Sequence, residues 1–144
     1  MKRIRTIEDY CIGCRLCEIF CIFEHSGHQT LVKAFSDRDS LPEAAVRVEE
    51  DGAISFALQC RHCEDAPCVA ACISGAMRRD PATGAIEHDE DRCVGCWSCV
   101  MVCPFGAIHV NREKNKVGSK CDLCGGKDVP ACVAHCPNEA LIYE

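Results

Sequence analysis

Residues 93–104 read CVGCWSCVMVCP, with two, two and three residues between successive cysteines and Pro104 directly after the last one. Residues 11–21 read CIGCRLCEIFC and repeat that spacing without the proline. Two further groups differ only in the middle gap, which has four residues within 60–72 and seven within 121–136. These four groups, called runs one to four in chain order, use all 16 cysteines of the 144-residue chain: Cys11, Cys14, Cys17, Cys21, Cys60, Cys63, Cys68, Cys72, Cys93, Cys96, Cys99, Cys103, Cys121, Cys124, Cys132 and Cys136.

A cysteine content this high is typical of disulfide scaffolds, structural zinc sites or iron–sulfur clusters. Disulfides need an oxidising compartment, and the leading residues MKRIRTIEDY contain neither an apolar signal core nor a twin arginine. Zinc usually takes two cysteines from each of two pairs, whereas these come as triplets with a fourth cysteine three residues on. That arrangement is typical of bacterial ferredoxins, so the spacing favours four [4Fe-4S] clusters in a cytoplasmic protein.

The composition is that of a protein whose metal groups replace part of the core. The hydrophobic share of 48% includes all 16 cysteines, so few ordinary apolar side chains remain to build one. The formal charge of −6 counts cysteines as neutral, and bound thiolates make the protein more negative. We therefore expect a largely unfolded apoprotein and docking to a basic patch on another protein, not to nucleic acid or an anionic membrane. No stretch approaches the roughly 18 apolar residues of a membrane span.

A short repeat follows the fourth cysteine of the last three runs. It reads CISGAM from Cys72, CPFGAI from Cys103 and CPNEAL from Cys136. Each copy predicts a short helix or turn that leads into a strand.

The segments between the runs predict hairpins. One is expected at 76–88 around a loop with Pro and Gly, and another at 46–58 around Asp51-Gly52, a strong turn signal. Strands are also expected at 107–110 and 140–143, and residues 25–41 are expected to be irregular. The predicted fold class is α+β, with short helices and β-hairpins.

Spacing alone leaves the sharing of cysteines open. In two-cluster ferredoxins the fourth cysteine of each run ligates the cluster of the other run, so four runs imply two cooperative units. The pairing can be nested, with run two paired to three and one to four. It can equally be tandem, with one paired to two and three to four.

With its wider gaps in runs two and four, the chain resembles the four-cluster iron–sulfur subunits of molybdenum or tungsten oxidoreductases, formate-linked hydrogenases and carbon monoxide dehydrogenases. The resemblance implies nested pairing, with one 2[4Fe-4S] ferredoxin-like unit inserted in another. The outer unit would comprise residues 1–41 plus 111–144, and the inner unit residues 42–110. The implied ligand sets are Cys11, Cys14, Cys17 and Cys136 for cluster 1; Cys60, Cys63, Cys68 and Cys103 for cluster 2; Cys93, Cys96, Cys99 and Cys72 for cluster 3; and Cys121, Cys124, Cys132 and Cys21 for cluster 4.

Shorter stretches resemble the ferredoxin-like subunit beside anaerobic carbon monoxide dehydrogenases. They are CIGCRLCE at 11–18, EHS at 24–26, QCRHC at 59–63, CVGCWSC at 93–99, KCDLC at 120–124 and CPNEAL at 136–141. The resemblance implies an electron-transfer subunit, without a substrate site, between carbon monoxide dehydrogenase and a flavin-dependent NAD(P) oxidoreductase or a hydrogenase. One alternative gives it the same role for a tungsten or molybdenum aldehyde or formate oxidoreductase. The other is a zinc-stabilised interaction module without a redox role.

Residues beside the cysteines could modify the clusters. His62 and His135 could donate hydrogen bonds to cluster sulfur. Arg61 and Lys120 could offset cluster charge or contact a partner, and Trp97 could cover its cluster.

No set of acid, base and nucleophile stands out for the conversion of an organic substrate. His25 and His28 are the only nearby histidine pair, and they are weak evidence for a further metal site because the cysteine groups need no histidine.

Overall fold

The computed structural model describes residues 2–144, which form the α+β fold of short helices and β-hairpins that the sequence predicts. The elements in chain order are β1 (Ile4–Thr6), the 3-10 helix η1 (Glu8–Tyr10), α1 (Leu16–His25), α2 (Leu31–Ser36), β2 (Arg47–Asp51), β3 (Ile54–Leu58), α3 (Pro67–Ala70), β4 (Met77–Arg79), β5 (Ile86–His88), α4 (Ser98–Val102), β6 (Val110–Asn111), β7 (Lys116–Val117), α5 (Leu123–Gly126), α6 (Ala131–Ala134) and β8 (Leu141–Tyr143).

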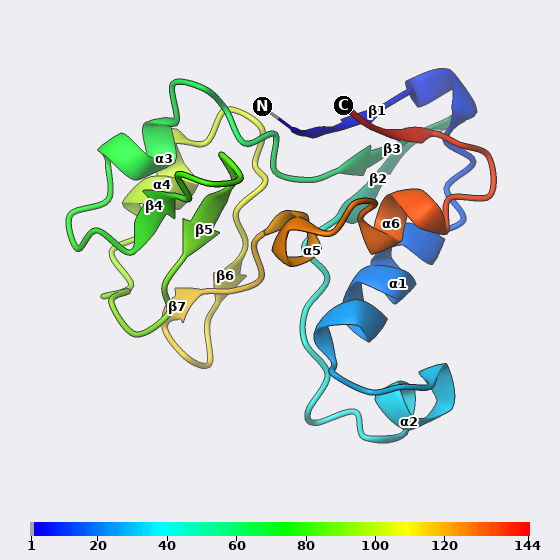
Figure 1. Ribbon diagram of the computed structural model, residues 1–144, viewed down its shortest axis with the longest axis horizontal. Coiled ribbons are helices and arrows are strands. Elements are labelled where there is room, and N and C mark those ends of the chain that lie inside the picture. Colours follow the sequence, from blue (N-terminus) through cyan, green and yellow to red (C-terminus); the bar gives the residue numbers. More distant parts are fainter. Residues whose placement is uncertain (1) are drawn as a thin grey trace.

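The strands pair antiparallel in four two-stranded sheets, β1 with β8, β2 with β3, β4 with β5 and β6 with β7. The hairpins predicted at 46–58 and 76–88 are confirmed as β2–β3 and β4–β5. The strand predicted at 140–143 is confirmed as β8, whose partner is the N-terminal strand β1. The two ends of the chain therefore lie side by side (Figure 1).

Two local predictions are wrong in part. The strand expected at 107–110 is reduced to Val110, because its partner β7 has only two residues and a single Gly118 N–H to His109 O bond of 2.7 Å extends the pairing. The segment 25–41, expected to be irregular, contains α2. The Thr30 hydroxyl caps that helix by accepting from the Lys33 amide at 3.4 Å, and Ala34 is the buried residue of the helix.

The molecule has two lobes with separate cores (Figure 1). One lobe contains β1, α1, β2–β3, α6 and β8, and the other contains α3, α4 and the hairpins β4–β5 and β6–β7. Cysteines belong to both cores. The first combines Cys17, Cys21 and Cys132 with apolar side chains such as Ile4 and Val48, and the second combines Cys68 and Cys99 with Met77, Ile86, Ile108 and Val117.

The packing bears on the two units expected from the sequence. The hairpin β2–β3 lies within the expected inner unit, yet it contacts η1, α1 and β1 of the outer one. Val117 belongs by number to the outer unit and is buried in the core of the other lobe. The division at residues 41 and 111 stays a prediction, and these contacts favour moving both boundaries toward the C-terminus.

Candidate metal centres

Three small cavities each have four cysteines in their lining. In each case three of the cysteines come from one run and the fourth comes from another. The linings contain Cys11, Cys14, Cys17 and Cys136 in the first cavity; Cys60, Cys63, Cys68 and Cys103 in the second; and Cys93, Cys96, Cys99 and Cys72 in the third.

The other four cysteines, Cys21, Cys121, Cys124 and Cys132, lie on or beside α1, α5 and α6. Burial raises the pKa of Cys132 above the ordinary thiol range, and the neighbouring thiols of Cys121, Cys21 and Cys124 raise it further. Burial also raises the pKa of Cys121 to about 12, with Cys60 and Cys21 among its neighbours. Cys21, Cys132 and Cys121 also pack in one core cluster, and the Ala131 amide beside Cys132 donates to Cys124 Sγ at 3.5 Å, so these four cysteines form a fourth group.

The third position of every run has a left-handed backbone. Gly13 and Gly95 occupy it in runs one and three, with φ of 67° and 72°. His62 and Leu123 occupy it in runs two and four, with φ of 47° and 57°. Because a side chain at positive φ is strained, these two residues keep the loop shape at a cost of about 1–3 kcal/mol each.

The repeat after the fourth cysteine has a packing explanation. Its alanines, Ala76, Ala107 and Ala140, are each only 2% exposed. Backbone amides at this position or one residue after it reach the preceding sulfur, Ala140 N–H to Cys136 Sγ at 3.2 Å and Met77 N–H to Cys72 Sγ at 3.3 Å. A small side chain therefore lets the chain approach the cysteine closely enough for N–H···S bonds.

A single ion and a cubane place different demands on four sulfur atoms. A Zn–S bond of about 2.3 Å places the sulfurs of a tetrahedral site about 4 Å apart. Within residues 2–144, no three side chains of His, Cys, Asp or Glu lie close enough to hold a single ion. A [4Fe-4S] cubane takes one cysteine thiolate on each of its four irons, so a cavity lined by four cysteines would fit this cofactor.

Exposure differs among the groups. Cys14 and Cys96 are the exposed cysteines, and they line the first and third cavities. Apolar side chains beside them are also open to solvent, with Ile12 65% and Val94 61% exposed. The second and fourth groups contain only buried and half-buried cysteines.

Several neighbouring residues have defined contacts. Arg61 lies over the ring of Phe105, 4.8 Å from its centroid, and Trp97 lines the third cavity beside its cysteines. His135 stacks on Phe20 at 3.6 Å and donates from Nδ1 to the Ala131 carbonyl at 2.9 Å, so this nitrogen is not free to reach sulfur.

His25 and His28 do not form a metal site with each other among the described residues. His25 instead joins two helices, with Nδ1 2.8 Å from Cys21 O in α1 and Nε2 3.1 Å from Asp122, the N-cap of α5. The Asp122 carboxylate, followed by the Cys21 contacts, raises the pKa of His25 to about 11. Through these contacts His25 connects α1 to the start of α5 and so orders the fourth cysteine group.

The most informative contact was not visible in the sequence. Lys120 precedes run four, yet its Nζ lies 3.2 Å from Cys60 Sγ in run two. Adjacent to it, His62 is fully buried, and burial together with the nearby Lys120 charge lowers its pKa to about 3. The sequence marks both residues as neighbours of cysteines, but only the fold shows that both bind the backbone of Ile86.

Taken with the fold, these cysteine groups define a small ferredoxin-like iron–sulfur protein. The family described as 4Fe-4S dicluster domain matches residues 52–144. An iron-sulfur protein from Rhodospirillum rubrum is 41% identical over 92% of this chain and 76% of its own length. The electron transport protein HydN of Escherichia coli is 40% identical over 92% of this chain and 81% of its own length.

The chain therefore belongs to the 4Fe-4S dicluster, ferredoxin-like family of electron-transfer subunits. The thiosulfate reductase electron transfer subunit PhsB of Salmonella typhi is 32% identical over 94% of this chain and 71% of its own length. Like these relatives, the chain is an electron-transfer subunit of oxidoreductase complexes and not a catalytic one, and its cofactors are four [4Fe-4S] clusters. No helix among residues 2–144 is long and apolar enough to cross a membrane.

Solved structures support the fold. A chain of the active site complex BamBC of benzoyl coenzyme A reductase, solved with 1,5-dienoyl-CoA, aligns with a TM-score of 0.53 and 24% identity. The alignment covers all of this chain and 75% of that one. At this identity the likeness concerns the fold alone.

Proposed function

We propose that this chain carries single electrons between a carbon monoxide dehydrogenase and a second redox protein, a flavin-dependent NAD(P) oxidoreductase or a hydrogenase, in the cytoplasm. The observation that carries the electron-transfer role is the complete use of 16 cysteines in four groups. The choice of carbon monoxide dehydrogenase rests on the residues between the cysteines, in particular QCRHC at 59–63 and CVGCWSC at 93–99.

The exposed cysteines support a path with two open ends. Cys14 and Cys96 belong to different cavities, and each has an exposed apolar neighbour, Ile12 or Val94. Because tunnelling falls steeply with distance, a partner has to approach a cluster closely. We propose that the two redox partners dock at these two ends.

The ligand sets are part of the proposal. We propose the nested sets given above. They are supported by the cavity linings, in which Cys136, Cys103 and Cys72 each lie with the three other cysteines of a different run. Cys103→Ser and Cys63→Ser should then alter the same EPR signal, and Cys96→Ser a different one. A signal shared instead by Cys103→Ser and Cys124→Ser would support tandem pairing and overturn the nested sets.

The partner is tested by direct reduction. The protein is purified anaerobically, mixed with a catalytic amount of carbon monoxide dehydrogenase and exposed to CO, while the loss of its visible absorbance is followed. We expect the enzyme to turn over many times and to reduce the whole sample of this protein. Without CO, the protein should stay oxidised. A matched mixture of formate dehydrogenase and formate is the comparison, and reduction only in that mixture would reject carbon monoxide dehydrogenase as the partner.

The alternative partner is a tungsten or molybdenum aldehyde or formate oxidoreductase. The similarity to a subunit named for thiosulfate reductase supports keeping it, because that relative serves another catalytic protein. The zinc module is tested by metal counting. About 16 irons per chain support four cubanes, whereas about four zinc ions and no visible absorbance would establish the module.

A further inference from the structure

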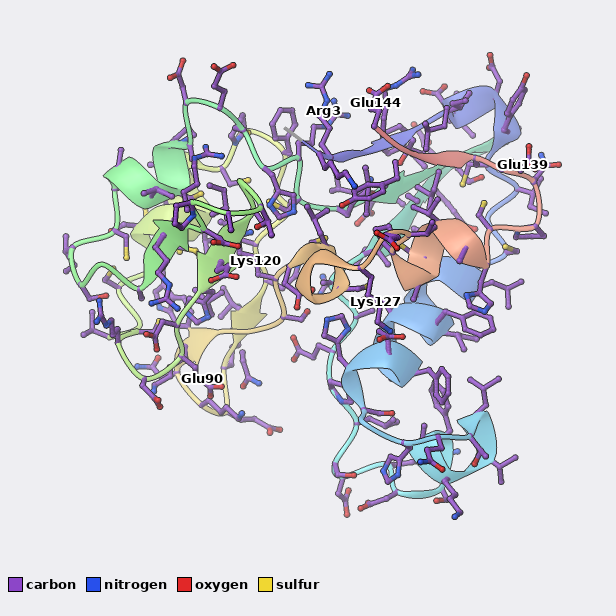
Figure 2. All side chains as sticks on the ribbon, viewed as in Figure 1. Arg3, Glu90, Lys120, Lys127, Glu139 and Glu144 are labelled. Atoms are coloured by element: carbon purple, nitrogen blue, oxygen red, sulfur yellow. The ribbon has the colours of Figure 1, made fainter. Side chains whose placement is uncertain are left out.

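Lys120 lies where the two lobes meet, beside α5 (Figure 2). Its Nζ is 3.2 Å from Cys60 Sγ, 2.5 Å from the Ile86 carbonyl and 3.2 Å from the Cys121 carbonyl. The side chain is half-buried. One ammonium group therefore connects a cysteine of the second cavity with the backbone of a cysteine in the fourth group.

His62 binds the backbone of the same residue, Ile86, as Lys120 does. The Ile86 amide donates to its Nδ1 at 2.8 Å, so in the neutral ring the proton is on Nε2. His62 is fully buried, and Nε2 has no hydrogen-bond partner among the described residues. The amide of His62 itself donates to Cys60 Sγ at 3.4 Å. A buried N–H donor without a partner is costly. His62 stands between Cys60 and Cys63 in the sequence, so its donors lie next to two proposed ligands of one cluster.

Packing alone does not require a histidine here. The equivalent position of run four is Leu123, which has the same left-handed backbone and is 1% exposed. An apolar side chain therefore satisfies this loop in the same protein. His62 adds a polar donor at a position with a strained backbone. Such strain is typical of functional sites, where the role of the side chain compensates for the conformational energy.

We propose that Lys120 and His62 are positioning residues that ease reduction of the cluster held by Cys60, Cys63, Cys68 and Cys103 and link it to the fourth cysteine group. The inference rests on the proposed ligand sets. Reduction adds negative charge to a cluster and its thiolates. An ammonium group in contact with one of these sulfurs, together with the His62 backbone N–H that donates to Cys60 Sγ and the buried ring N–H of the same residue, stabilises that charge and raises the reduction potential.

The same contacts shorten the route between lobes. Lys120 bridges Cys60 Sγ and the Cys121 carbonyl through two contacts of 3.2 Å. An electron that leaves one group therefore crosses hydrogen bonds rather than open space. The cluster nearest this junction becomes the easiest to reduce and holds an electron between the two ends of the protein.

The test is an anaerobic EPR redox titration of the fully loaded protein and of Lys120→Met. We expect the reduction potential of one cluster to fall and those of the other three to stay unchanged. The expected change is at least tenfold in the reduction equilibrium, which corresponds to 59 mV for one electron. Lys120→Arg should restore most of the shift. Lys114→Met removes the same charge from an exposed ion pair with Glu90 and should leave all four potentials in place.

A pair of substitutions tests His62. His62→Asn keeps an acceptor near the Nδ1 position and tolerates the left-handed backbone but has no group at Nε2, whereas His62→Gln keeps a donor near Nε2. The Asn variant should shift the same cluster as Lys120→Met, and the Gln variant should shift it less. Equal potentials in wild type and both Lys120→Met and His62→Asn would overturn the inference.

Iron content separates this inference from the proposed function. A wild-type protein with fewer than four clusters would reject the proposed function, whatever the variants do. Four clusters in wild type with unshifted variants would reject only the junction. If Lys120→Met loses iron, Lys120→Gln is titrated in its place. Iron loss in both variants would assign Lys120 a purely structural role and would also overturn the inference.

Discussion

The third residue of each run has a left-handed backbone, but the four runs use different residue types there. Gly13 and Gly95 adopt the left-handed conformation freely, whereas His62 and Leu123 adopt it under strain and are buried. Gly95 has a second reason to be glycine, because a Cβ there would collide with the Asn115 carbonyl. The loop that precedes β7 therefore packs directly against run three.

Gly95→Ala should destabilise the loaded protein by about 1–3 kcal/mol, since it adds a collision to the cost of a positive φ. Gly75→Ala is the matched control, because Gly75 has a similar φ of 68° but open space around its missing Cβ. Anaerobic guanidinium unfolding, followed by visible absorbance, measures both. Equal losses would show that the contact with Asn115 contributes nothing.

At the scale of the elements, the repeat places a small residue where a strand or turn approaches a cysteine. Ala140 is 2% exposed, and its amide donates to Cys136 Sγ. Ala140→Val should cost about 1–3 kcal/mol through overpacking and should speed the release of iron from the first cavity. Ala82→Val, the same change on an exposed loop, should have little effect on either measurement. An unchanged rate of iron release in Ala140→Val would contradict this explanation of the repeat.

The strand β1 is hydrogen-bonded to β3 and to the residue after it, as well as to β8. The Thr6 hydroxyl donates to the Ala57 carbonyl at 2.5 Å, and Gln59 Nε2 donates to the Ile4 carbonyl at 3.2 Å. Thr6→Val removes one of these bonds at nearly constant volume, so we expect a loss of about 1–2 kcal/mol in anaerobic unfolding. Thr6→Ser keeps the hydroxyl, so it is the control and should lose less stability. A loss in Thr6→Ser as large as that in Thr6→Val would reject the role of this bond in joining the strands.

Local patterns predicted the elements better than their partners. The turn signal Asp51-Gly52 and the strand at 140–143 were correct because short-range residue preferences determine them. The pairing of β8 with β1 and the packing of β2–β3 on α1 depend on contacts between distant residues, which no local pattern encodes. The cysteine runs were visible at once, but the contact between Lys120 and Cys60 arises only when two distant loops meet. Helix α2 was missed because a single cap and one buried alanine define it.

At the scale of the whole molecule, cysteines occupy positions that a larger protein gives to apolar side chains. Cys17, Cys21 and Cys132 lie within one core, and Cys68 and Cys99 lie within the other. Burial raises the pKa of several of these thiols, Cys17 to about 12 and Cys99 to about 11, so without iron they remain neutral and make no ligand bonds. The two lobes then depend on small apolar cores and two-stranded sheets.

Removal of iron should therefore unfold most of the protein. Binding at a structural metal site contributes on the order of 10 kcal/mol, which is comparable to the roughly 5–15 kcal/mol total stability of an ordinary domain, and this chain has four such sites. Anaerobic chelation is expected to abolish near-UV circular dichroism and the cooperative thermal transition, and renewed iron and sulfide should restore both. Native-like near-UV dichroism with a sharp transition in the iron-free protein would contradict this dependence and would show that the two cores hold the fold without their clusters.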